Sequence, residues 1–322
     1  MQSRKTSADL WHQKPYYSLD AWCKNTYGRK LYKAALDIGC TCPNRDGTLD
    51  TRGCIFCSAG GSGDFAASRQ LSVTDQLNQA KALLSSKWTP EPGKPSLIAY
   101  FQAYTNTYGD PDRLLSCYEE ALSSPEVAGI SIATRPDCLS DIILEGLDRL
   151  RLLYPDRFIW IELGLQSIHD HTAARIRRGY PTSVFYDAAA KLHARKLPFI
   201  VHLILGLPGE TRLDLLESIR AVNQVHPFGV KLQLLHILKG TDLALFYEAG
   251  KLPVLTQEEY LDLLTSCIAA LSPDICLHRV TGDGPRKLLI APQWSLSKRN
   301  VLNRLHALMK QRNLRQGDKI EK

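Results

Sequence analysis

The chain has 322 residues and a mass of 36.0 kDa, and its 40 lysines and arginines outnumber its 33 aspartates and glutamates. This length and a hydrophobic content of 44% predict a soluble globular protein with one large α/β domain and appended ends, or two domains. The longest apolar stretch, residues 199–207, is interrupted and far too short to span a bilayer, which excludes a membrane-embedded protein.

The amino-terminal segment, residues 1–30, is basic and rich in aromatic residues. Its first ten residues include Arg4, Lys5 and Asp9 and form no apolar stretch, so no secretory signal is visible. Four of the nine cysteines are crowded between positions 40 and 57, unlike the evenly spread cysteines of a secreted disulfide protein. We therefore predict a cytoplasmic protein that begins with a short N-terminal arm.

From residue 31 onward, apolar runs alternate with helical patterns. Strands are predicted at 31–38, 97–102, 129–134, 158–165, 199–205 and 229–236. Helices are predicted between them at 72–86, 111–123, 139–153, 182–196 and 211–225. The strands are almost wholly apolar, as parallel strands buried on both faces are. Six such units predict an α/β fold, a partial (β/α)6 TIM-like barrel over residues 31–255. A basic α-helical C-terminal extension, residues 256–322, follows with helices at 256–271 and 295–312.

The loop after the first predicted strand holds Cys42, Cys54 and Cys57. Thiolates bind soft metals, and a cubane iron–sulfur cluster held by three of them leaves one iron open to a substrate or cofactor. Cys40 extends the pattern to C-x-C-x11-C-x2-C, so a structural zinc site with four thiolates is the alternative. The spacing favours the cluster, because zinc ribbons usually carry two C-x-x-C pairs. The role of Cys40 stays open.

Small and polar residues follow four of the predicted strands at the point where each strand stops. They occupy positions 102–106, 133–137, 162–167 and 202–210. Each segment alone reads as an ordinary turn. The carboxyl ends of barrel strands share one face, however, and the functional groups of such barrels gather there. The sequence therefore predicts a site at that face, beside the three-cysteine loop.

The cysteine loop and two of the strand-end segments together resemble the radical S-adenosylmethionine (SAM) superfamily. They are the cysteine loop, Glu-Leu-Gly-Leu-Gln-Ser at 162–167 and His-Leu-Ile-Leu-Gly-Leu-Pro-Gly-Glu-Thr at 202–211. A narrower resemblance, to the YhcC/YtqA-type group, rests on Cys-Pro-Asn-Arg-Asp-Gly at 42–47, Ala-Thr-Arg-Pro-Asp-Cys-Leu at 133–139, Thr-Gly-Asp-Gly-Pro-Arg at 281–286 and Ala-Pro-Gln-Trp at 291–294. The radical core of that group is similar to that of the Elongator catalytic subunit. The cysteine spacing here resembles the stretched Elongator loop more than the C-x3-C-x2-C loop of most members.

The resemblance implies two cofactors, a 4Fe-4S cluster on Cys42, Cys54 and Cys57 and SAM chelated to the open iron. The reduced cluster would cleave SAM to methionine and a 5′-deoxyadenosyl radical, which abstracts hydrogen from carbon. The electron would come from a one-electron donor such as flavodoxin or ferredoxin. SAM contacts are implied at the positions that match the family: Gln102, Ala103, Tyr104, Thr134, Gln166, Arg178 and His202. Arg178 also reads as a solvated charge and Thr134 as the end of a turn, and His202 stands where several relatives have an acidic ribose ligand.

Positive charge is concentrated at the two ends of the chain. Residues 1–33 have seven basic and two acidic residues, and residues 285–322 have ten and two, whereas residues 34–284 have 23 and 29. Basic ends on an acidic body suit a polyanion such as RNA, whose phosphates give affinity without sequence specificity. Aromatic residues from Trp11 to Tyr32 would either stack on bases or, more commonly, fasten the arm to its own domain.

The Elongator type builds a carbon substituent on the wobble uridine of tRNA. The resemblance therefore implies an enzyme that modifies tRNA at the side chain of a wobble uridine. Two alternatives stay open: a radical SAM enzyme that acts on a small metabolite or peptide, and a non-enzymatic zinc-stabilised RNA-binding protein. No motif marks the residues that would act on the substrate.

Overall fold

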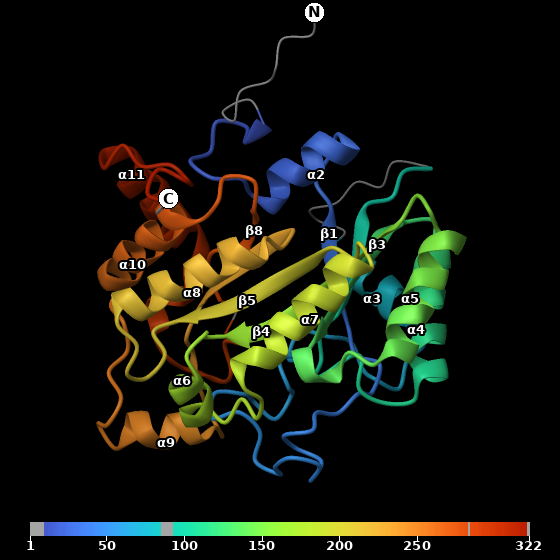
Figure 1. The fold of residues 1–322 in the computed structure, drawn as a ribbon, viewed down its shortest axis with the longest axis horizontal. Helices are drawn as coiled ribbons and strands as arrows, with labels where there is room; N and C mark the ends of the chain where they lie inside the picture. Colours follow the sequence, from blue (N-terminus) through green and yellow to red (C-terminus); the bar gives the residue numbers. More distant parts are fainter. Residues whose placement is uncertain (1–9, 85–92, 283, 321–322) are drawn as a thin grey trace, which may run out of the picture.

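The computed structural model describes residues 10–84, 93–282 and 284–320. Its centre is a sheet of seven parallel strands, which lie side by side in chain order (Figure 1). They are β1 (Tyr32–Leu36), β2 (Leu97–Phe101), β3 (Val127–Thr134), β4 (Phe158–Gln166), β5 (Phe199–Leu205), β6 (Gly229–Leu234) and β8 (Cys276–Arg279). The sheet begins at β1 and ends at β8, so the predicted partial barrel is confirmed, with one strand more than the six expected.

Helices connect consecutive strands and cover the outer face of the sheet (Figure 1). The five that were predicted are α3 (Val73–Leu84), α4 (Pro111–Ser123), α5 (Asp141–Leu153), α7 (Thr182–Ala194) and α8 (Arg212–Val225). Side chains of Asp110, Ser140 and Thr211 cap three of them by accepting hydrogen bonds from N–H groups of the first turn. Four short elements have no predicted counterpart, because they are too short to show a helical period: α6 (Asp170–Arg175), α9 (Asp242–Glu248) and the 3₁₀ turns η1 (Pro136–Cys138) and η2 (Gln293–Leu296).

An aromatic cluster closes the barrel at the amino ends of the strands. Trp22 packs against Trp160 and Phe158, with ring centroids 5.0 and 5.6 Å apart, and Phe228 completes the cluster. Each large side chain buried in this way stabilises the fold by about 1.5–3 kcal/mol. Because this end is filled with aromatic rings, the carboxyl ends of the strands are left as the end at which ligands enter.

The N-terminal arm lies on the domain. Its helix α2 (Leu19–Tyr27) carries Trp22 into the aromatic cluster, and Trp11 and Tyr16 are each only 4% exposed. The backbone N–H of Leu277 in β8 donates to the carbonyl of Tyr17 at 2.7 Å. The aromatic residues therefore fasten the arm, which is the commoner of the two predicted roles, and the buried rings are not available to stack on bases.

The segment after residue 255 is helical where predicted, but it also contributes strands. Its helices are α10 (Gln257–Ala270), which starts at a capping box of Thr256 and Glu259, and α11 (Lys298–Gln311). Between them, β8 joins the sheet and β9 (Leu289–Ala291) pairs with β7 (Ile237–Leu238) in an antiparallel ribbon. β8 was not predicted because its four residues include a histidine and an arginine, which leave too short an apolar pattern.

The two basic ends of the chain meet. The backbone N–H of Gln316 donates to the carbonyl of Pro15 at 2.9 Å, and the N–H of Tyr17 donates to Oε1 of Gln316 at 2.9 Å. Both ends pack on the same sheet, so the boundaries drawn at residues 30/31 and 255/256 stay predictions. No helix in the part of the chain described here is long and apolar enough to cross a membrane.

Candidate cofactor site

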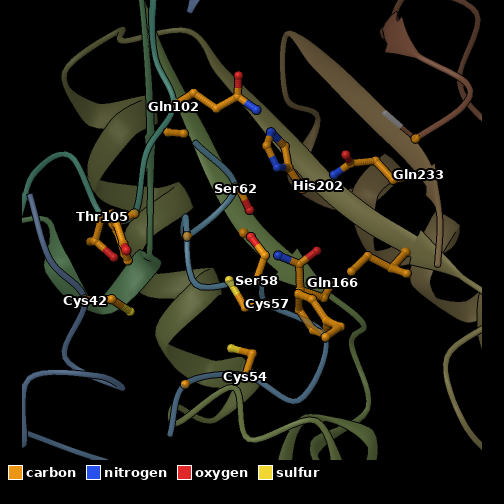
Figure 2. A pocket seen from close by; sticks show the side chains of 18 of the residues that line it. Cys42, Cys54, Cys57, Ser58, Ser62, Gln102, Thr105, Gln166, His202 and Gln233 are labelled. Atoms are coloured by element: carbon orange, nitrogen blue, oxygen red, sulfur yellow. The ribbon is translucent and has the colours of Figure 1, made fainter. Parts of the chain in front are cut away.

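A cavity of about 250 Å³ opens at the carboxyl ends of the strands. Nine of the ten residues predicted for the site line it: Cys42, Cys54, Cys57, Gln102, Tyr104, Thr134, Gln166, Arg178 and His202. The cysteines lie at one side of the cavity and Gln102, His202 and Gln233 at the other, with Gln166 between them (Figure 2). The fold therefore brings together Cys42 and Gln233, which are 191 residues apart in the sequence.

The cysteine loop between β1 and α3 is held in shape by two side chains of its own Cys-Pro-Asn-Arg motif. Asn44, which is 1% exposed, donates through Nδ2 to the carbonyls of Arg177 and Arg178 at 2.7 and 3.0 Å. Arg45 donates through Nη2 to the carbonyls of Cys57 and Ser58, both at 2.8 Å. Asn44 thus fixes the loop to the segment that follows β4, and Arg45 fixes the two ends of the loop to each other.

The three cysteine sulfurs lie further apart than the thiolates of a single zinc ion. Three thiolates on one tetrahedral zinc at 2.3 Å would lie about 3.8 Å apart. The sulfurs of Cys42, Cys54 and Cys57 do not all lie within 4.8 Å of one another in the described structure. Cys40 is 3% exposed, belongs to the hydrophobic core and does not line the cavity. The four-thiolate zinc alternative is therefore wrong, and Cys40 is a core residue.

A glycine-rich segment packs the cysteine loop against the end of β2. Gly61 has a φ of +55°, and a Cβ there would lie 2.3 Å from the Tyr104 ring. A Cβ on Gly63 would lie 2.6 Å from the Cβ of Ala103. Ala103, predicted as a SAM contact, is fully buried under this segment and does not line the cavity. Only glycine permits this close approach of the loop to Ala103 and Tyr104, the residues that follow Gln102.

Gln166 presents a buried acceptor. Its backbone has a φ of +67°, and its Oε1 is buried without a hydrogen-bond partner among the described residues. Such an orphaned oxygen costs roughly 1–3 kcal/mol unless a ligand or water satisfies it. An unsatisfied amide beside three cysteines fits a bound cofactor.

Arg178 is only 2% exposed and donates to the carbonyls of Leu165 and Ser167 at 2.9 and 2.6 Å and to Oγ1 of Thr182 at 3.0 Å. It therefore holds the turn that carries Gln166, and it is not a solvated charge. Its predicted contact with SAM stays a prediction, because its guanidinium already bonds within the protein. Thr134 shares a 2.5 Å hydrogen bond with Thr107 and lines the same wall.

A buried charged network, not predicted from the sequence, forms the floor of the cavity. Glu162 is fully buried and accepts hydrogen bonds from Lys231, from Lys33 at 3.0 Å and from His202 Nε2 at 2.8 Å. Burial alone would raise the pKa of Glu162, but Lys231, Lys33 and His202 hold it well below its usual value. Burial, followed by repulsion from Lys231, lowers the pKa of His202 to about 4. His202 is therefore neutral at pH 7, with its proton on Nε2, because the carboxylate can only accept.

The far wall comes from Gly282 and Pro285 and from the end of β6. Gly282 and Pro285 line the cavity together with His236, which follows β6. A Cβ on Gly282 would lie 2.2 Å from the His236 ring, and His236 Nε2 lies 3.1 Å from Oγ of Ser295. Burial lowers the pKa of His236 to about 4, so this wall is uncharged at that point. A sequence signal for the floor and this wall did exist. It is a charged or imidazole side chain inside or directly after an otherwise apolar strand, such as Glu162 in β4 or His236 after β6.

These residues fit the implied cofactors. Three thiols, an unpartnered amide oxygen and a glycine-lined approach are the donors and the space that a three-cysteine cluster with SAM requires. Burial, reinforced by Cys57, raises the pKa of Cys54 to about 12, so metal binding would have to displace the proton.

Comparison with known proteins agrees with this arrangement. The chain matches the Radical SAM superfamily over residues 42–222 and the Radical_SAM C-terminal domain over residues 227–311. It is similar to YtqA of Bacillus subtilis (strain 168), with 41% identity over 305 residues that cover 95% of this chain and 92% of that protein. It is also similar to YhcC of Escherichia coli (strain K12), with 36% identity over 271 residues that cover 83% and 84%.

Among solved structures, the fold resembles the archaeal Methanocaldococcus infernus Elp3, with a TM-score of 0.65, 16% identity, and coverage of 89% of this chain and 64% of that one. At this identity the likeness concerns the fold alone. Family membership implies a 4Fe-4S cluster and SAM. The sequence match, the partial barrel and the three-cysteine cavity agree: the chain belongs to the radical SAM superfamily.

Proposed function

We propose that this radical SAM enzyme modifies tRNA, at the side chain of a wobble uridine. The observation that carries the proposal is the position of the basic C-terminal segment, whose described part, residues 285–320, runs from the wall of the cavity along α11 to the N-terminal arm. α11 alone is about 20 Å long, so its cations can follow several phosphates of a nucleic acid.

Acidic side chains of the domain neutralise part of this charge. Arg304 pairs with Glu258 and Arg312 with Asp262, each at 2.6 Å. Arg286 and Arg299, at the cavity end of the segment, have no ion pair with any of the described residues, and they lie near the cavity. A polyanion that binds there brings its reactive group to the cavity mouth, which supports RNA over a small neutral metabolite. The sequence resemblance to the Elongator type supports tRNA among RNAs.

In this proposal, Cys42, Cys54 and Cys57 hold the cluster and Gln166 bonds SAM through its unpartnered oxygen. When bound, the reduced cluster with SAM supplies a radical that abstracts hydrogen from carbon. The protein holds the reactants in a cavity whose floor is the buried Glu162–His202 network, and the packed aromatic rings at the amino ends of the strands close the barrel beneath it, which excludes water and stray hydrogen donors. We further propose Gln102, Tyr104, Thr134 and His202 as SAM contacts, with Arg178 as the residue that positions Gln166. The electron donor proposed is flavodoxin or ferredoxin.

Deletion of the gene, followed by mass spectrometry of tRNA nucleosides, tests the substrate. We expect one modified nucleoside to disappear and to return when wild-type protein is supplied, whereas Cys54→Ala protein should not restore it. An unchanged nucleoside profile would count against tRNA and favour a small metabolite or peptide. Removing the tail from Ser295 is a poor test, because Val301, Leu305 and Met309 of α11 are fully buried in the core.

A further inference from the structure

Beside the cavity lies a second hollow of about 640 Å³, which we call the basic groove. It is lined by Phe65, Gly284, Arg286 and residues 295–299, which include Lys298 and Arg299. Its volume lies in the range of about 300–1,000 Å³ that is usual for ligand sites. None of the described residues that line it is acidic.

The basic groove and the cofactor cavity share a wall. Phe65 lines both hollows, and it is 53% exposed. On the other side, Gly282 and Pro285 face the cavity whereas Gly284 and Arg286 face the groove. One short segment and one aromatic ring therefore separate the place where the radical chemistry occurs from a cationic surface.

The cations of the groove differ from the others of the C-terminal segment. Arg286 and Arg299 are exposed, and neither has a hydrogen bond or ion pair with any of the described residues. Arg304 and Arg312, further along α11, each have an acidic partner. The groove therefore carries two cations that no acidic side chain among the described residues neutralises.

We propose that the basic groove binds the phosphates next to the target nucleotide, that Phe65 stacks on a neighbouring base, and that the target base enters the cavity between Phe65 and Pro285. The ligand class is single-stranded RNA, such as a tRNA loop. A cationic track combined with an exposed aromatic ring is the usual means of holding unpaired RNA, and enzymes that act on a base first take it out of the stack. This inference rests on the proposed function and specifies its substrate-binding surface.

Equilibrium binding of labelled tRNA and of a short single-stranded RNA to anaerobically purified, cluster-loaded protein tests the groove. The variants are the double substitution R286E/R299E and F65A, and the matched control is K310E, an exposed cation about 16 Å along α11 from Arg299. We expect R286E/R299E to weaken binding at least tenfold and to reduce the slope of log K against log salt by about two. F65A should weaken binding about 5- to 150-fold, and K310E less than threefold.

The outcomes separate this inference from the proposed function. Binding by R286E/R299E and F65A that equals binding by K310E would overturn the groove, while the nucleoside profile of the deletion strain would still decide the substrate. Loss of short-RNA binding in R286E/R299E together with an unchanged tRNA profile would support the groove and refute tRNA as the substrate. Wild-type protein that binds neither RNA would overturn both. Unchanged iron content and melting temperature show that each variant is folded.

Discussion

Replacing Glu162 by glutamine should destabilise the protein strongly, and the loss should shrink as pH rises. Glu162 is fully buried, and it is the only carboxylate in contact with the buried ammonium of Lys231 among the described residues. Breaking a buried pair by removing one partner costs about 3–5 kcal/mol, because the remaining charge is stranded. The stranded ammonium can also lose its proton. From the ordinary lysine pKa of 10.5, that loss costs about 5 kcal/mol at pH 7 and about 2 kcal/mol at pH 9.

The sign follows from proton linkage. Burial lowers the pKa of Lys231 well below its usual value, so the unfolded chain binds more protons than the folded one between that lowered pKa and 10.5. Stability then rises with pH over that window, and it does so more steeply without Glu162. At about 2 °C per kcal/mol, the melting temperature of E162Q should be about 6–10 °C below that of the wild type at pH 7, and about 4 °C or less below it at pH 9.

Thermal unfolding of cluster-loaded protein at pH 7, 8 and 9 measures these differences. The control is Glu126→Gln, which breaks the half-exposed pair with Lys81 and should cost about 0–1 kcal/mol. The double variant E162Q/K231M should recover most of the loss, since no ammonium is stranded. The reasoning is refuted if E162Q melts like E126Q, or if its difference from the wild type grows with pH.

Three further predictions address the site. Cys42→Ser should severely reduce the bound iron and the visible absorbance of the cluster. Cys40→Ser should keep the iron and lower the free energy of unfolding by about 1–3 kcal/mol, because it buries a hydroxyl. Iron analysis together with thermal unfolding checks both variants, and loss of iron in Cys40→Ser would restore Cys40 as a ligand. Gly61→Ala should weaken SAM binding at least tenfold in equilibrium dialysis, because the added Cβ meets the Tyr104 ring. The control is Gly47→Ala, where φ is +93° and the space is open, and it should cost only about 1 kcal/mol of stability. Equal SAM affinities of the two variants would contradict this account. The folded pKa of His202 is about 4 and its unfolded pKa is about 6.5, so its contribution to the free energy of unfolding is present above pH 6.5 and is lost between pH 6.5 and 4, on the order of 3 kcal/mol. His202→Gln should therefore flatten the dependence of the free energy of unfolding on pH in that window. An unchanged slope would show that His202 is not buried.

The local sequence was sufficient for the features that repeat or that are chemically distinctive. Apolar runs near residues 97–102 and 199–205 identify buried parallel strands, because a strand covered on both faces needs apolar side chains throughout. The three cysteines of the loop identify a metal centre by residue type alone, and the position of that loop after the first strand places it at the carboxyl end of the barrel.

The roles of particular residues were decided only by tertiary structure. Cys40 and Cys42 are two residues apart, yet one packs in the core and the other lines the cavity. Glu162 and Lys231 are 69 residues apart, and no local pattern pairs them; the pairing depends on which strands are neighbours and in what register. Arg178 matched a cofactor anchor in sequence, but the fold surrounds it with carbonyl groups that use its donors. Sequence specifies local backbone preference and chemical type, whereas the direction and the partners of a side chain depend on distant segments that only the folded sheet brings together.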